Sequence, residues 1–136
     1  MIPKRFTGKP DGNDPRYYVL GGDHLGAAVA TQLRASGAIV TLVTEQTDLE
    51  TDAIVGNPAD VDLLTEAGLD DASRVIVATR SDRRNLLIAQ LVGVRFDVEN
   101  IVVLINDPER HDPIYEAGHE VVCATTALST ALVKST

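Results

Sequence analysis

The chain has 136 residues, of which 44% are hydrophobic and 24% charged, and its formal net charge is −8. This length and composition predict one globular domain and exclude a disordered chain. No apolar run in the sequence approaches the roughly 20 residues needed to span a bilayer. The excess of acidic side chains disfavours binding to nucleic acid phosphates or directly to an anionic membrane.

Residues 1–15 are rich in Pro, Gly, Lys and Asp without hydrophobic periodicity, so we expect a flexible leader there and no secretion signal. From residue 16 to residue 136, short apolar segments alternate with helical patterns, as expected of one Rossmann-like domain. The predicted strands are 17–20, 39–43, 53–55, 74–79, 101–105 and 120–123. The predicted helices are 24–36, 59–67, 83–94, 107–118 and 126–133, whereas the polar run 44–52 holds at most a short helix.

Alternating strands and helices form parallel β-α-β units, and right-handed crossovers arrange such units in a doubly wound sheet. We therefore predict an α/β fold with a mainly parallel six-stranded sheet and helices on both faces. In the first helix, Leu25, Val29 and Leu33 predict one buried stripe. Asn57 is expected to cap the helix 59–67.

The first predicted strand runs into Gly21-Gly22-Asp23-His24-Leu25-Gly26. A strand, a glycine turn and a helix are the layout of the dinucleotide-binding fingerprint G-x-G-x-x-G, here with Asp23 at the second glycine position. Gly21 and Gly26 keep the tight turn and the close helix–strand contact. A phosphate placed against the Asp23 carboxylate is expected to bind about tenfold to a thousandfold more weakly than against glycine. That carboxylate is either a site residue or a cap on the following helix.

Further segments come in the order and spacing of one family: Gly56-Asn57-Pro58, Leu64 to Ala72, Val75 to Thr79, Asn85-Leu86-Leu87 and Asn106-Asp107-Pro108. Over about residues 16–133 the chain resembles the RCK/TrkA N-terminal domain family, the nucleotide-binding part of potassium transporters and channels. The resemblance implies a homodimer or larger ring that binds NAD(H) or another adenine nucleotide. It implies a regulatory, non-enzymatic subunit of a potassium uptake system or channel.

The resemblance also implies a membrane-embedded potassium transporter subunit as partner, with the chain cytoplasmic and peripheral at the inner face of the membrane. We do not expect the family's C-terminal regulatory lobe, because the sequence ends at Thr136. The lone Cys123 fits a reducing compartment, and the acidic, Lys-poor composition leads us to hypothesise a salt-adapted source.

The sequence departs from the family pattern at several ligand positions. Where the family has an acidic residue that binds the ribose, this chain has Thr44, followed by Glu45. Asn57 replaces an acidic residue, and Leu104 or Ile105 replaces a basic one. These changes indicate that the usual ligand is weakened, changed or lost.

The residues expected to contact a nucleotide all lie at the carboxyl edge of the predicted sheet or in the glycine loop. They are Gly21, Gly22, Asp23, His24, Leu25, Gly26, Thr44, Glu45, Gly56, Asn57, Ala78, Thr79 and Arg80. Arg80 has two interpretations, as a positive charge for a phosphate and as a partner in a surface ion pair. Arg83 and Arg84 are assigned to a solvated helix face.

The pattern contains no convincing catalytic or metal site. Cys123 is interpreted as a small core residue, and His111 and His119 are too isolated in sequence to form a metal centre. Besides the nucleotide-binding regulator, two interpretations stay open: a degenerate Rossmann module that only dimerises and docks, and, as the weakest, a fragment of an NAD(P)-dependent oxidoreductase.

Overall fold

The computed structural model describes residues 15–116 and 118–136. Apart from Pro15, the leader predicted over residues 1–15 lies outside the described residues. The strands are β1 (Arg16–Leu20), β2 (Ile39–Thr44), β3 (Ile54–Val55), β4 (Arg74–Val77), β5 (Ile101–Ile105) and β6 (Glu120–Cys123). The helices are α1 (Asp23–Ala35), α2 (Val61–Glu66), α3 (Asp82–Arg95), α4 (His111–Glu116) and α5 (Ala124–Lys134), with short 3₁₀ turns at Leu69–Asp71 and Pro108–Arg110.

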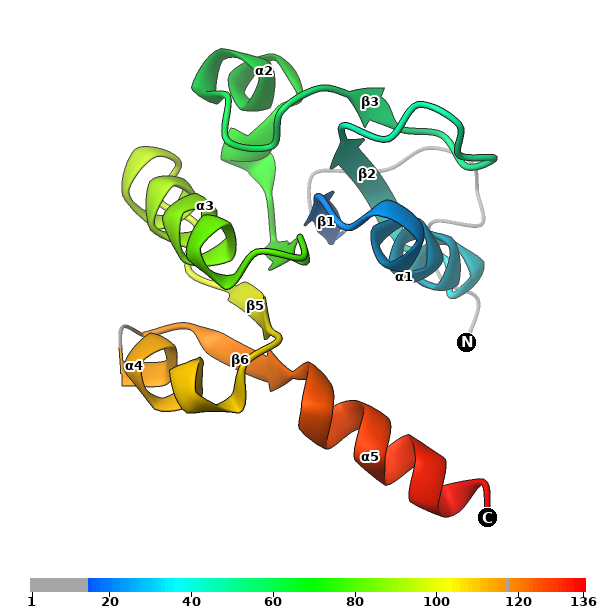
Figure 1. Cartoon of the computed structure of the whole chain (residues 1–136). Helices are drawn as coiled ribbons and strands as arrows, with labels where there is room; N and C mark the ends of the chain where they lie inside the picture. The colour runs from blue at the N-terminus through cyan, green and yellow to red at the C-terminus, as the bar shows by residue number, and fades with distance from the viewer. Residues whose placement is uncertain (1–14, 117) are drawn as a thin grey trace.

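The six strands form one all-parallel sheet in the order β3-β2-β1-β4-β5-β6. The chain winds outward from β1 in one direction to β3 and then in the other direction from β4 to β6 (Figure 1). The predicted doubly wound α/β fold is therefore confirmed. The order reverses between β1 and β4, and open α/β sheets bind their ligands at the carboxyl end of such a reversal.

The two faces of the sheet are covered differently. On one face, α1 packs over Val19 and Leu42, in a small cluster completed by Ala30. On the other face, α2, α3 and α4 enclose a larger core in which Leu64 and Ile88 are fully buried. Helices thus cover both faces, which suits strands that are apolar without alternation.

The stripe predicted for α1 is partly wrong. Leu25 is 49% exposed, whereas Gly26 and Ala30 are the buried residues of the helix. A side-chain carbon at Gly26 would collide with the carbonyl oxygen of Gly21. The start of the helix lies so close to the glycine loop that only small residues fit on the side facing the sheet. The larger Leu25 therefore points outward.

The start of α2 also differs from the prediction. The helix begins at Val61, and its N-cap is Asp60, whose carboxylate accepts hydrogen bonds from the backbone N–H groups of Asp62 and Leu63. Asn57 instead closes a turn, with its side-chain oxygen 2.9 Å from the backbone nitrogen of Ala59. Asp60, and not Asn57, therefore caps the N-terminus of α2.

The C-terminal helix α5 is longer than predicted and projects away from the sheet (Figure 1). None of its residues is buried, and Leu128, Leu132 and Val133 are 62%, 68% and 71% exposed. Within the described part of the chain, no helix combines the length and the apolar character needed to cross a membrane.

Candidate functional site

A cavity of about 230 Å³ opens at the carboxyl edge of the sheet, where β1 and β4 lie side by side. The glycine loop, the end of β2 and the segment that joins β4 to α3 form its walls. Its lining residues are Gly21, Gly22, Asp23, Thr44, Glu45, Pro58, Thr79, Arg80, Ser81 and Arg84. Seven of these ten residues belong to the set expected from the sequence.

The glycine loop can take its shape only with small residues. Gly21 and Gly22 have φ angles of 80° and 95°, in the left-handed region that side chains disfavour. A side-chain carbon at Gly21 would collide with the Thr79 side chain, and one at Gly22 would lie 2.5 Å from the carbonyl oxygen of Ala78. The loop therefore lies directly on the end of β4 and brings the start of α1 to the cavity.

Asp23 does not cap α1, so that interpretation is wrong. The N-cap is Gly22, with no side-chain hydrogen bond to the helix, and Asp23 is the first helical residue at a φ of 31°. Its carboxylate instead lies 3.4 Å from Arg80. The surface ion pair that was one interpretation of Arg80 is thus present, and its partner is the acidic residue of the glycine loop.

Thr44 and Glu45 lie at the end of β2. Thr44 is 1% exposed, and its hydroxyl oxygen accepts a hydrogen bond from the backbone nitrogen of Gln46 at 3.1 Å. The Glu45 carboxylate is exposed, and its Oε1 atom lies 2.9 Å from Nη2 of Arg84. A buried hydroxyl and an exposed carboxylate therefore stand side by side where Rossmann sites hold a ribose.

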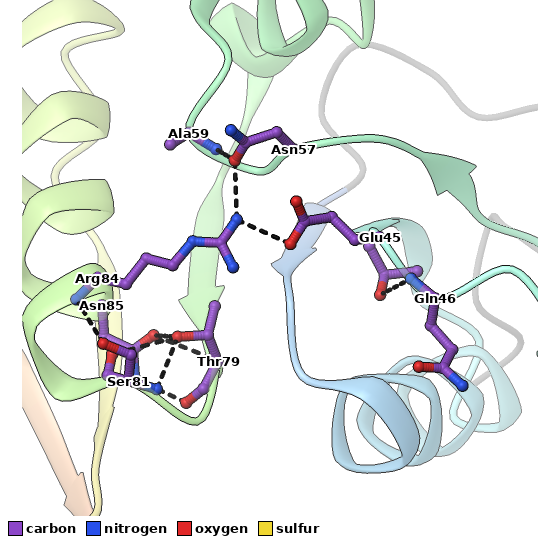
Figure 2. A network of polar contacts seen from close by, with 9 residues as sticks. Glu45, Gln46, Asn57, Ala59, Thr79, Ser81, Arg84 and Asn85 are labelled. Carbon is purple, nitrogen blue, oxygen red and sulfur yellow. Dashed lines mark hydrogen bonds and ion pairs between the residues drawn. The ribbon is translucent and has the colours of Figure 1, made fainter.

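Arg84 lines the cavity, so its assignment to a solvated face is wrong. Its Nη2 atom also donates to the side-chain oxygen of Asn57 at 2.9 Å, and Figure 2 shows the guanidinium group between Asn57 and Glu45. The signal was available in principle: helical side chains point toward the helix N-terminus, so a long side chain in the first turn of α3 extends over the strand ends. Pro58 and Ser81 are two further lining residues absent from the expected set.

A buried amide positions Thr79 at the cavity wall. Asn85 is fully buried, and its side-chain oxygen accepts hydrogen bonds from the backbone nitrogen and the hydroxyl of Thr79. Its Nδ2 atom donates to the carbonyl oxygens of Thr79 at 3.0 Å and Leu104 at 2.9 Å. One side chain thus ties the ends of β4 and β5 to the first turn of α3, and Figure 2 shows its contacts with Thr79.

A second buried group, Asp82, supports the same turn of α3. Its carboxylate accepts hydrogen bonds from the backbone nitrogens of Asn106 and Asp107 at 2.8 and 2.9 Å and from the Asn106 side chain. Burial alone would raise the pKa of Asp82, but these hydrogen bonds together hold its pKa below the ordinary value. Asp82 therefore stays ionised and fixes the loop after β5.

The other expected site residues lie beside the cavity rather than in its wall. Gly26 and Ala78 are buried beneath the glycine loop, and Gly56 precedes the Asn57 turn. His24 and Leu25 are exposed on α1.

Cys123 is half-buried at the end of β6 rather than in the core. It is the N-cap residue of α5, and hydrogen bonds from Thr126 lower the pKa of its thiol. Over residues 15–116 and 118–136, no group of three or more His, Cys, Asp or Glu side chains is placed to hold a metal ion.

The family model of the TrkA-N domain matches residues 17–125. The Trk system potassium uptake protein TrkA homolog of Methanothermobacter thermautotrophicus is 30% identical over 108 residues, which cover 74% of this chain and 50% of that protein. The chain thus spans about half the length of this curated relative.

The fold is shared with solved structures, among them the following two. A crystal structure of GsuK bound to ADP superimposes with a TM-score of 0.80 at 25% identity, over 94% of this chain and 35% of that one. The NAD(P)-binding domain of an exopolyphosphatase-related protein from Archaeoglobus fulgidus superimposes with a TM-score of 0.75 at 25% identity, over 88% of this chain and 95% of that one.

Proposed function

Because the chain belongs to the TrkA-N domain family, we propose that it binds an adenine nucleotide such as ADP or NAD(H) and thereby regulates a potassium uptake system or channel. The observation that carries the proposal is the cavity at the reversal between β1 and β4, with the glycine loop as one wall. GsuK with ADP and the NAD(P)-binding domain from Archaeoglobus fulgidus have the same fold, which supports this class of ligand.

In this proposal the phosphates lie at the start of α1, where backbone N–H groups without helical partners and the positive end of the helix dipole attract an anion. Gly21 and Gly22 let the backbone approach them. The adenosine ribose lies toward the end of β2, where Thr44 and Glu45 offer hydrogen-bonding groups. Arg80 supplies positive charge on the opposite wall.

The charges of the cavity balance. Two carboxylates, Asp23 and Glu45, pair with two guanidinium groups, Arg80 and Arg84. A bound phosphate competes with Asp23 for Arg80, so we expect weaker nucleotide binding than in a site with glycine at the second fingerprint position. The same pairing favours the second candidate function, a domain that keeps the fold for association and no longer binds nucleotide.

We propose that the chain acts as a homodimer or larger ring on a membrane-embedded potassium transporter subunit, at the cytoplasmic face, and by regulation rather than catalysis. The relative from Methanothermobacter thermautotrophicus is a potassium uptake protein, which supports this assignment. The exposed apolar side chains of α5 give the chain a surface suited to association with a second copy.

Isothermal titration calorimetry tests the proposal with NAD, NADH, ADP, ATP and AMP, in concentrated potassium chloride because of the strong negative charge of the chain. We expect saturable binding of at least one of them with one site per chain. If none binds to folded protein, as judged by circular dichroism on the same sample, the nucleotide assignment is wrong and the association domain is favoured.

A further inference from the structure

Resting on the proposed nucleotide site, we infer that Arg84 and Glu45 together set its specificity at the ribose 2′ position. Glu45 holds Arg84 in a carboxylate pair, so the site takes adenine nucleotides with a free 2′-hydroxyl. Loss of the Glu45 charge turns Arg84 into a receptor for a 2′-phosphate.

Arg84 is held at this corner by two independent contacts. Nη2 lies 2.9 Å from Oε1 of Glu45 and 2.9 Å from Oδ1 of Asn57. Asn57 is itself fixed, because the same Oδ1 atom accepts the backbone N–H of Ala59 at 2.9 Å. Figure 2 shows both contacts. When the Glu45 carboxylate is removed, the guanidinium group therefore keeps Asn57 as its anchor and stays at this corner.

The guanidinium group also has donors to spare. Arginine carries five N–H donors in a rigid fork that matches the oxygens of a phosphate. Among the described residues, the protein acceptors of Arg84 both lie against Nη2. Arg84 lines the cavity, so its N–H donors on Nε and Nη1 are left to bind a ligand there.

The group at the ribose 2′ position decides whether an acidic residue or an arginine binds it. In Rossmann sites, an acidic residue after the second strand accepts the 2′-hydroxyl of NAD, whereas a nearby arginine accommodates the 2′-phosphate of NADP. Here both groups stand at one corner and neutralise each other. A 2′-hydroxyl donates to the Glu45 carboxylate, whereas a 2′-phosphate placed there is repelled by it. The Thr44 hydroxyl beside them is compatible with either ligand.

The test compares NAD and NADP, which differ only in the 2′-phosphate, by calorimetry. The proteins are the wild type, Glu45→Gln, Arg84→Gln and the double variant. Arg83→Gln is the matched control, because Arg83 is the preceding residue of α3, is exposed and does not line the cavity. Thermal unfolding of each variant verifies that it is folded.

We expect the wild type to bind NAD more tightly than NADP. In Glu45→Gln, the ratio of the two dissociation constants should shift toward NADP by about tenfold or more, the effect of one removed charge at short range. The shift should vanish in the double variant, and Arg83→Gln should keep the wild-type ratio.

Two failures are distinguishable. If neither NAD nor NADP binds the wild type or any variant, this inference is overturned, and the proposed function falls with it only if NADH, ADP, ATP and AMP also fail to bind. If NAD binds and the ratio is the same in wild type and Glu45→Gln, or shifts equally in Arg83→Gln, only the specificity assignment to Arg84 and Glu45 is wrong.

Discussion

Asp23 and Arg80 join the glycine loop to the segment after β4, with Oδ2 of Asp23 3.4 Å from Nη2 of Arg80. The two side chains are 40% and 84% exposed, so the pair contributes at most about 1 kcal/mol to stability. Its larger effect is on the cavity that both residues line. The Asp23 carboxylate pairs with the Arg80 guanidinium group, which would otherwise neutralise a phosphate bound at the start of α1.

Asp23→Gly is therefore expected to increase the affinity for ADP by about tenfold, because it removes the repulsion and frees Arg80. Glycine also suits the φ of 31° at this position. Isothermal titration calorimetry measures the change. Asp23→Asn separates the charge from the side-chain volume and should give most of the gain.

Asp70→Asn is the control for net charge, because Asp70 is exposed in the 3₁₀ turn Leu69–Asp71 and does not line the cavity. It should leave the dissociation constant of ADP unchanged. An equal gain in Asp70→Asn would mean that the overall charge of the chain, and not Asp23, limits binding. No gain in either Asp23 variant would contradict the role assigned to the ion pair.

Asn85→Ala is expected to lower the free energy of unfolding by about 3 kcal/mol, measured by urea denaturation. The substitution leaves the backbone N–H of Thr79 and two carbonyl oxygens without their buried partner. Asn100→Ala is the control, because Asn100 is exposed and its amide lies 3.4 Å from an acceptor. Equal effects of the two substitutions would show that the buried network adds nothing to stability.

Asp82→Asn is expected to change how stability depends on pH. The folded-state pKa of Asp82 lies below the ordinary value, because the hydrogen bonds from Asn106 and Asp107 outweigh the effect of burial. Its contribution is therefore fully present above the unfolded pKa of about 3.9 and is lost as the pH falls through the folded-state pKa. The wild type should lose stability over that acid range, and Asp82→Asn should lose less.

Urea midpoints measured between neutral and acid pH check this difference. At neutral pH, Asp82→Asn should be less stable by about 2 kcal/mol, because an amide nitrogen then faces backbone donors. Asn106→Ala, which removes one of the hydrogen bonds and keeps the two from the backbone, should fall between the two proteins. Parallel acid profiles for wild type and Asp82→Asn would refute the assignment.

Most of the fold follows from local patterns in the sequence. The predicted bounds of β5 and β6 agree with the structure. For β5 the reason is plain, since its five apolar residues lie between Asn100 and Asn106. Errors arise where two residues compete for one role or where packing decides. Asp60 takes the cap expected of Asn57, and the contact of Gly26 with the glycine loop rotates α1 away from the stripe at Leu25.

The site was less predictable, because it depends on which loops meet. Glycines and strand ends place Gly21, Thr44 and Thr79 at one edge by topology alone. The ion-pair partners of Asp23 and Glu45 come from the segment after β4. The direction of first-turn side chains predicts that Arg84 extends over the strand ends, but the packing of α3 against the sheet decides that it reaches β2. The spacing of residues along the sequence does not predict the short distance between Arg84 and Glu45.

Helix α5 carries the exposed apolar side chains assigned to the proposed homodimer. Leu128 and Leu132 are four residues apart and therefore lie on one side of the helix, both largely exposed. If this side packs against a second copy, replacing both leucines with glutamate should weaken dimerisation by about a hundredfold or more. Sedimentation velocity over a range of protein concentrations measures the change from dimer to monomer.

Val94→Glu is the matched control, because Val94 is an exposed apolar residue on α3, 88% exposed. It should leave the association unchanged. No residue of α5 is buried, so the leucine substitutions should alter the free energy of unfolding of the domain by no more than about 0.5 kcal/mol. A wild type that sediments as a monomer, or a dimer that persists in the double variant, would contradict an interface on this side of α5.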